Sequence, residues 1–222
     1  MKRKRLLLAG IGLLLLFALW TVLIQCVDVQ AIGPGDTKVG FAALNAWFHR
    51  LTGVNLTLYT VTDWLGLVPV FICGCFGILG LRQWILRKKL FQVDSDILLL
   101  GVYYLTVILG YLFFEMVPIN YRPILIDGYL EASYPSSTTL LVLSVMPTLA
   151  FQAERRSGKR TIRSIAVWFS ALFSAFMVIG RTVSGVHWAT DILGSVLLSA
   201  GLFLLYDAAV TRADRKKKEA LL

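Results

Sequence analysis

Six long apolar stretches dominate this chain of 222 residues and restrict what it can fold into. Crossing the ~30 Å hydrocarbon core of a bilayer takes about 20 helical residues, and each stretch reaches or approaches that length. Backbone polar groups must be paired within lipid, so such segments form helices. We therefore expect an all-α protein, a six-span transmembrane helical bundle formed as one integral membrane domain over residues 1–222. The expected spans are 6–26, 58–81, 97–117, 136–152, 164–180 and 188–207.

The basic residues fall in alternate loops between these spans. A net charge of +9 is compatible with nucleic-acid binding, but 18 of the 22 Lys and Arg lie in four clusters, at 2–5, 82–89, 155–163 and 212–218. This is the positive-inside pattern, so we expect both termini to be cytoplasmic. The clusters are expected to contact anionic head groups of the bilayer rather than nucleic acid. The remaining basic residues, in the loops expected outside, are Lys38, Arg50, Arg122 and Arg181.

The first outer loop contains FAALNAWFHRL at residues 41–51, in which apolar residues recur at helical spacing. This pattern predicts an amphipathic helix lying on the outer membrane surface. His49 belongs to it and is interpreted as an interfacial residue rather than a catalytic one. Asp63, near the outer part of the second span, is either an interfacial polar residue or a substrate contact.

Two arginines lie in loops expected outside, where the positive-inside pattern leaves few basic residues. Arg122 lies in NYRP at 120–123, and Arg181 opens RTVSGVHWATD at 181–191. A guanidinium offers a planar fork that binds phosphate oxygens in pairs. Two converging arginines would form a phosphate clamp, whereas the alternative is a pair of snorkelling or salt-bridged side chains.

The stretch ASYPSSTT at 132–139 immediately precedes the fourth span. Pro, Ser and Thr are typical of helix starts. The N-terminus of that helix would present unpaired N–H groups at the outer surface, which favours an anion site. Plain helix capping is the alternative interpretation.

One of the two histidines lies beside charged residues at the last span. His187 and Asp191 are four residues apart, so they share a face if the helix begins near His187. Asp191 would then accept the proton of one ring nitrogen and leave the other free as a nucleophile. A buried polar pair that only satisfies itself is the alternative. Ionisable groups in membrane spans are usually functional, which favours catalysis.

In chain order the three stretches read RP at 122–123, YPSST at 134–138 and R-x5-H-x3-D at 181–191. This order resembles the type 2 phosphatidic acid phosphatase superfamily of integral membrane lipid phosphatases, whose motifs are K-x6-RP, PSGH and SR-x5-H-x3-D. The resemblance covers residues 97–207 by motif order, with the motif region at 115–191. It extends to the whole chain by topology, because that family has six spans and outward-facing motifs.

The resemblance implies a role for each matching residue. His187 would attack phosphorus and form a phosphohistidine, and Asp191 would orient it. Arg122 and Arg181 would hold the phosphoryl oxygens and stabilise the charge of the transition state. The resemblance implies no metal and no cofactor. Further substrate contacts are expected from Ser136, Ser137, Thr138, Glu115 and Tyr121.

The sequence departs from the family pattern in all three motifs. Glu115 stands in place of the lysine, Ser137 and Thr138 in place of the glycine and histidine of PSGH, and Gly180 in place of the serine. The missing histidine is the one that protonates the leaving group in the family. Glu115 and Glu131 are candidates for a replacement acid. We also expect Glu115 to pair with Arg122 or Arg181.

The predicted function is hydrolysis of a lipid phosphate or diphosphate at the outer face of a cell membrane, which the short loops suggest is bacterial. A diphosphate expels phosphate, which needs little protonation, so a polyprenyl diphosphate suits this sequence better than phosphatidic acid. One alternative is a catalytically weak or inactive relative that binds a lipid phosphate as a carrier or partner subunit. Another is a metal site built from His187, Asp191 and outer carboxylates.

Overall fold

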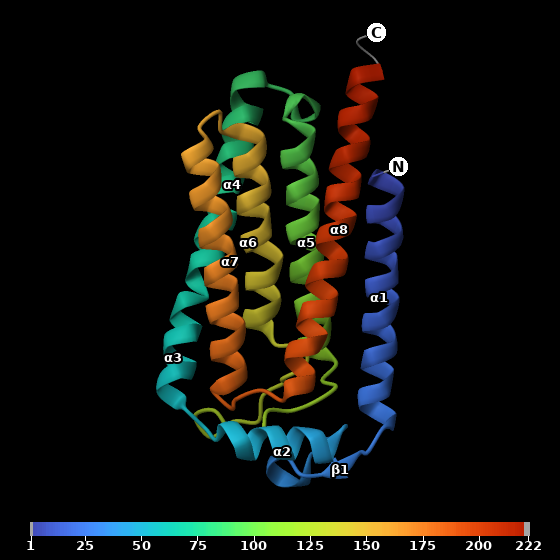
Figure 1. The fold of residues 1–222 in the computed structure, drawn as a ribbon, viewed down its shortest axis with the longest axis vertical. Helices are drawn as coiled ribbons and strands as arrows, with labels where there is room; N and C mark the ends of the chain where they lie inside the picture. Colours follow the sequence, from blue (N-terminus) through green and yellow to red (C-terminus); the bar gives the residue numbers. More distant parts are fainter. Residues whose placement is uncertain (1, 220–222) are drawn as a thin grey trace.

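The computed structural model describes residues 2–219 and consists almost entirely of α-helices (Figure 1). Long helices run side by side, and the start of α1 and the described end of α8 lie at the same end of the bundle. A short antiparallel pairing of β1 with β2, which the apolar pattern did not predict, joins α1 to α2. The elements are α1 (Lys2–Cys26), β1 (Gln30–Ala31), η1 (Pro34–Asp36), β2 (Lys38–Val39), α2 (Ala42–Thr52), α3 (Leu56–Leu65), α4 (Leu67–Arg87), η2 (Leu90–Gln92), α5 (Ser95–Met116), α6 (Ser137–Arg156), α7 (Arg160–Val183) and α8 (Ala189–Glu219).

Five helical segments are long and apolar enough to cross a membrane, by length and composition. They correspond to five of the six expected spans, and the last runs to Glu219, well beyond the expected end at 207. The structure therefore describes an all-α protein with several candidate spans. They are Arg3–Cys26, Leu56–Arg87, Ser95–Met116, Arg160–Val183 and Ala189–Glu219.

The remaining expected span, 136–152, corresponds to α6, which is too polar to be among these segments. Helix α6 contacts α4, α5, α7 and α8, so other helices surround it. Its polar side chains bond to neighbouring helices: Tyr104 and Thr148 hydroxyls lie 2.6 Å apart, and Gln152 donates to the Tyr206 hydroxyl at 2.8 Å. Because its neighbours are protein rather than lipid, this helix tolerates polar residues that lower its hydropathy.

The expected second span is broken into α3 and α4 at Gly66. The Gly66 N–H donates to the carbonyls of Thr62 and Asp63 and ends α3. A Cβ at Gly66 would lie 2.8 Å from the Asp63 carbonyl oxygen and 3.4 Å from the Thr138 methyl group. Pro69 then lies in the first turn of α4, where its missing N–H is tolerated. Helix α3 lies against α7 near Gly180, where a Cβ would lie 2.7 Å from Thr62.

Helix α2 matches the expected amphipathic helix at 41–51 and covers one end of the bundle (Figure 1). Leu44, Trp47 and Leu51 are exposed on its outward side, as expected of a helix at a membrane surface. Its inward side bonds to the start of α8, because the buried Asn45 amide donates to the Thr190 hydroxyl at 3.0 Å.

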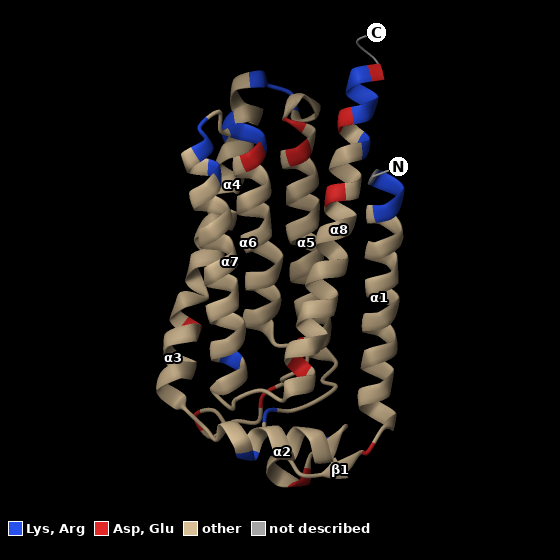
Figure 2. Ribbon diagram, viewed as in Figure 1, with Lys and Arg blue, Asp and Glu red and all other residues tan. Residues whose placement is uncertain are grey.

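Lys and Arg gather at the end of the bundle opposite α2 (Figure 2). There the acidic side chains of Asp94 and Asp96 pair with Arg156 at 3.0 and 2.8 Å, and Arg155 pairs with Asp214 at 2.8 Å. These ion pairs join the ends of α5, α6 and α8. The distribution agrees with the expected charge asymmetry and distinguishes a basic end from the end that contains α2.

Candidate active site

His187 lies in the short loop that joins α7 to α8, at the end of the bundle covered by α2. The ring is buried, with 3% of its surface exposed. Its Nδ1 lies 3.2 Å from the Ser133 carbonyl oxygen, and its Nε2 lies 3.2 Å from Nη2 of Arg181. A carbonyl only accepts and a guanidinium only donates. The two contacts therefore assign the proton to Nδ1 and the free lone pair to Nε2.

The surroundings of His187 keep the ring neutral. Burial, followed by the positive charges of Arg122 and Arg181, lowers the pKa of His187 well below its ordinary value of 6.5. The hydrogen bond to the Ser133 carbonyl acts in the opposite direction but is outweighed. A neutral imidazole with an unprotonated Nε2 is the form that acts as a nucleophile.

Asp191 is buried beside His187, but it does not make the expected orienting hydrogen bond. Its nearest oxygen lies 4.0 Å from His187 Nδ1, which is too far for a hydrogen bond. Asp191 instead accepts from the Asn120 amide at 3.1 Å and from the Trp188 backbone N–H at 3.0 Å. The Ser133 carbonyl takes the place at Nδ1 that was expected for Asp191. The aspartate holds together the loops on either side of the ring.

The two arginines expected to form a phosphate clamp converge on His187 and share one aromatic neighbour. The guanidinium carbons of Arg181 and Arg122 lie 4.8 and 5.7 Å from the centre of the Tyr59 ring, within the range of cation–π attraction. Tyr59 lies on α3. No pattern in the sequence pointed to it, since one tyrosine in an apolar helix is common.

Each arginine also has a carboxylate neighbour. Arg122 Nε lies 3.0 Å from Glu131, and Arg181 Nη1 lies 3.5 Å from Asp63. Glu115, which was expected to pair with one of these arginines, has no ion pair among the described residues. The 117–136 loop folds back on itself, with the Arg122 N–H donating to the Glu131 carbonyl at 3.1 Å. This pairing places Glu131, not Glu115, beside Arg122.

Some guanidinium donors are left without a partner. Within the described chain, Nη1 of Arg122 and Nε of Arg181 are buried and make no hydrogen bond. Arg122 is 7% exposed and Arg181 is fully buried. Buried polar groups are nearly always paired, so unpaired donors on two converging cations indicate a site suited to an anion.

Ser136, Ser137 and Thr138, which were expected to contact the substrate, lie at the start of α6. The Ser136 N–H is directed at the Asp191 carbonyl oxygen at 3.4 Å, and the Ser136 hydroxyl donates to Thr139 at 3.0 Å. Ser136 is therefore a buried structural contact between α6 and α8. Ser137 lines a cavity, and Thr138 lies beside Gly66 at the break between α3 and α4.

Two cavities meet at the start of α6. A polar cavity of about 210 Å³ is lined by Glu115, Arg122, Glu131 and Ser137, among others. An apolar groove of about 310 Å³ runs between α3, α4, α5 and α6, with Asp63 and Thr138 in its lining. Tyr111 and Ser137 line both. The arrangement places a polar compartment next to an apolar one, as an amphiphilic ligand requires.

Two other residues singled out from the sequence have structural contacts. Tyr121 accepts the Trp188 indole N–H at 2.8 Å through its backbone carbonyl, and its side chain does not line either cavity. The His49 Nε2 lies 3.1 Å from the Gly185 carbonyl, so this histidine joins α2 to the loop of His187. Gly185 has a φ of +69°, and a Cβ there would collide with the Gly53 carbonyl, which explains the glycine.

Ser133 and Asn120 belong to the site but were missed from the sequence. Both lie in the loop before α6, where the Ser133 N–H donates to the Asn120 carbonyl at 2.9 Å. Ser133 acts through its backbone, which leaves no signal in the residue type. Among the described residues, no group of three His, Cys, Asp or Glu lies close enough to hold a metal ion.

Comparisons with known proteins identify a family and a fold. The sequence model of the PAP2 superfamily matches residues 97–215, which include all three motifs. A search of curated proteins finds no match. A solved structure, the crystal structure of the first transmembrane PAP2 type phosphatidylglycerolphosphate phosphatase from Bacillus subtilis, shares the fold with a TM-score of 0.64. It is 20% identical and aligns over 93% of this chain and 96% of its own.

Proposed function

Because the chain belongs to the PAP2 superfamily, we propose that it is a lipid phosphatase that hydrolyses a lipid phosphate or diphosphate at the outer membrane face. The observation that carries the proposal is the state of His187. Its pKa is lowered by burial and by two arginines, and its Nε2 lone pair faces the guanidinium of Arg181 at 3.2 Å. A neutral nucleophile next to two cations suits attack on a phosphoryl group.

The reaction proceeds in two displacements. The Nε2 lone pair forms a bond to phosphorus while the bond from phosphorus to the leaving oxygen breaks, and the electron pair departs on that oxygen. Water then attacks phosphorus, the bond from phosphorus to Nε2 breaks with its electron pair returning to the ring, and phosphate leaves after the attacking water has given up a proton to the solvent. The phosphoryl oxygens take over donors of Arg181 and Arg122, including the two that have no partner. This exchange also breaks the contact between Arg181 and Nε2. Binding of the phosphoryl group therefore exposes the nucleophilic nitrogen.

The adjoining cavities support lateral entry of a lipid. The head group would occupy the polar cavity of about 210 Å³, and the tail would lie in the apolar groove between α3, α4, α5 and α6. Asp63 and Thr138 would then lie where tail and head meet. The Bacillus subtilis protein of the same fold is a phosphatidylglycerolphosphate phosphatase, so a phosphomonoester lipid is one candidate here.

A diphosphate remains the substrate that we favour. Thr138 occupies the place of the motif histidine and cannot protonate a leaving alkoxide near neutral pH. The Glu131 carboxylate is held in an ion pair with Arg122. Glu115 lines the polar cavity without an ion pair among the described residues, and is the remaining carboxyl candidate for an acid. An expelled phosphate needs no such acid.

The path of the chain supports a topology with six membrane crossings. The helices run alternately along the bundle, and the described ends of α1 and α8 lie at the same end (Figure 1). With α6 as a crossing helix, both termini lie on the basic side, which the positive-inside rule assigns to the cytoplasm. The candidate active site then faces outward.

An inactive lipid-phosphate-binding relative is the second candidate. The absence of an acid at Thr138 and the contact of Arg181 with the nucleophilic nitrogen favour it. In that case the arginines would hold a lipid phosphate without cleaving it.

The decisive experiment measures phosphate release by the purified protein in detergent, with a chelator present. A polyprenyl diphosphate, its monophosphate, phosphatidylglycerolphosphate and phosphatidic acid are compared for wild type and His187→Ala. We expect release from the diphosphate by wild type and none by the variant. Arg50→Ala is the control, because this arginine is exposed on α2 and lines neither cavity. No release from any substrate by folded wild type would favour the binding protein, and faster turnover of a monoester would overturn the diphosphate preference.

A further inference from the structure

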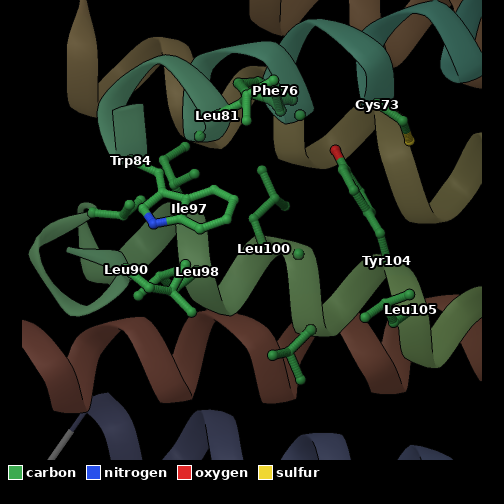
Figure 3. Close-up of a pocket in the computed structure, with 15 residues that line it drawn as sticks. Cys73, Phe76, Leu81, Trp84, Leu90, Ile97, Leu98, Leu100, Tyr104 and Leu105 are labelled. Atoms are coloured by element: carbon green, nitrogen blue, oxygen red, sulfur yellow. The ribbon is translucent and has the colours of Figure 1, made fainter. Parts of the chain in front are cut away.

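A second apolar groove lies between α4 and α5, at the opposite end of the bundle from His187. It has a volume of about 430 Å³, within the ~300–1,000 Å³ typical of ligand sites. Figure 3 shows Leu81 and Trp84 from α4 facing Ile97 and Leu98 from α5 across it. The Tyr104 hydroxyl is satisfied by Thr148 at 2.6 Å. The lining is therefore apolar and suits a hydrocarbon chain.

The length of the groove matches one leaflet of a bilayer. Its lining on α4 extends from Cys73 to Trp84, which at 1.5 Å per residue is about 16 Å. Half of a ~30 Å hydrocarbon core is about 15 Å. The groove begins at the basic end of the bundle, where α4 ends at Arg87. Trp84 lies at that end (Figure 3), as tryptophans do at the level of lipid head groups.

Glycines keep the groove open. A Cβ placed on Gly77 or Gly101 would meet no other atom within 4 Å, although both residues line the groove. Larger side chains at these positions would extend into unoccupied space. The groove is thus a property of the side-chain lining, and it can be filled by substitution without moving the helices apart.

Positive charge without a counter-ion lies at the mouth of the groove. Arg87 is paired with Asp94 at 2.9 Å. Lys88 and Lys89 follow it in the turn, both exposed, and neither has an ion pair within the described part of the chain. Figure 2 shows this turn as basic. Leu90, the next residue, already lines the groove, so the two ammonium groups are next to its opening.

We propose that the α4–α5 groove binds one anionic phospholipid of the cytoplasmic leaflet, with an acyl chain between Trp84 and Cys73 and its phosphate at Lys88 and Lys89. A second copy of the chain is a poorer occupant, because it would bring its own basic turn against this one when packed about a symmetry axis along the bundle. The site lies at the opposite end of the bundle from His187 and does not depend on the proposed hydrolysis.

The test is native mass spectrometry of the full chain, released from nanodiscs that contain equal amounts of phosphatidylglycerol and phosphatidylcholine. We expect wild type to retain one phosphatidylglycerol at least five-fold more often than phosphatidylcholine. Gly101→Leu, which fills the groove, should lower the retained lipid at least five-fold. Gly110→Leu is the matched control on the same helix, because a Cβ there also meets nothing within 4 Å and Gly110 does not line the groove.

The double variant Lys88→Gln, Lys89→Gln tests the contribution of the lipid head group separately from that of the acyl chain. It should retain lipid but lose the preference for phosphatidylglycerol. Equal retention of both lipids by wild type would overturn the proposal, as would equal lipid retention by Gly101→Leu and Gly110→Leu. A wild-type dimer that Gly101→Leu converts to monomer, without any change in bound lipid, would overturn it in favour of a second copy.

Discussion

His187 takes up its proton only well below pH 6.5 in the folded protein, because burial and two arginines oppose the charge. The unfolded chain binds this proton near its ordinary pKa of ~6.5. Between these two pKa values the unfolded state binds more protons, so stability falls as the pH drops below about 6.5, by at most ~1.4 kcal/mol per pH unit. The melting temperature of wild type should therefore fall more steeply than that of His187→Asn between neutral and mildly acidic pH. Equal slopes would show that the ring titrates normally.

Tyr59 places an aromatic face under both arginines of the site. A cation–π contact at a desolvated site contributes up to ~2 kcal/mol. Tyr59→Leu should therefore lower kcat/KM by about 10-fold, since ~1.4 kcal/mol corresponds to a factor of ten. Tyr59→Phe keeps the ring and should stay within about two-fold of wild type by the same conversion. If both variants lose activity equally, the hydroxyl rather than the ring face is what matters.

The two glutamates of the polar cavity should behave differently. Glu131 holds Arg122 at 3.0 Å, whereas the contact expected for Glu115 is not formed. Glu131→Gln should lower kcat on the order of 10-fold, because Arg122 would lose the carboxylate that orients it toward the phosphoryl group. Glu115→Gln should have less effect on a diphosphate but should slow a monoester if Glu115 supplies the proton. Parallel kinetics on the two substrates measure this, and equal slowing of both by Glu115→Gln would contradict an acid role.

At the scale of helices, small residues permit α1 to pack closely against α8. A Cβ on Gly10 would lie 2.8 Å from Leu205 and 3.1 Å from the Gly201 carbonyl oxygen. Helix α1 in turn supports the site, because the Thr21 and Tyr134 hydroxyls lie 2.7 Å apart. Gly10→Leu should lower the free energy of unfolding by about 1–3 kcal/mol through overpacking. Gly12→Leu on the same helix meets nothing within 4 Å and should leave the melting temperature unchanged. Similar losses in both variants would contradict the contact.

The helices were easier to predict than their roles. Apolar length alone predicted five of the candidate spans, because lipid imposes helices on such segments. The break at Gly66 was missed, since a glycine next to apolar residues does not by itself indicate a kink. Helix α6 was expected to be an ordinary span. Its polar residues lower its hydropathy and are tolerated because they pair with other helices, and this pairing is a tertiary fact that local composition does not contain.

At the scale of the whole molecule, the sequence predicted which residue types form the site but not all of their contacts. His187, Arg122 and Arg181 were identified from motif spacing, and the structure brings them together. The expected contacts of Asp191 with His187 and of Glu115 with an arginine are not formed among the described residues, because both depend on the path of the 117–136 loop. That loop brings in a backbone carbonyl from Ser133 and an amide from Asn120. Long-range pairing of this kind leaves no periodic signal in the sequence.

The orientation of the molecule gives the last prediction. The basic end of the bundle should face the cytoplasm and the end covered by α2 should face outward (Figure 2). In a variant with Cys26, Cys73 and Cys75 changed to Ser, single cysteines can report the side. Asp36→Cys should react with a membrane-impermeant maleimide on intact cells, whereas Lys217→Cys should react only after permeabilisation. Lys159→Cys, in the turn between α6 and α7, tests whether α6 crosses. If it reacts like Asp36→Cys, α6 does not span the membrane. If it reacts like Lys217→Cys, the chain crosses six times and His187 faces outward.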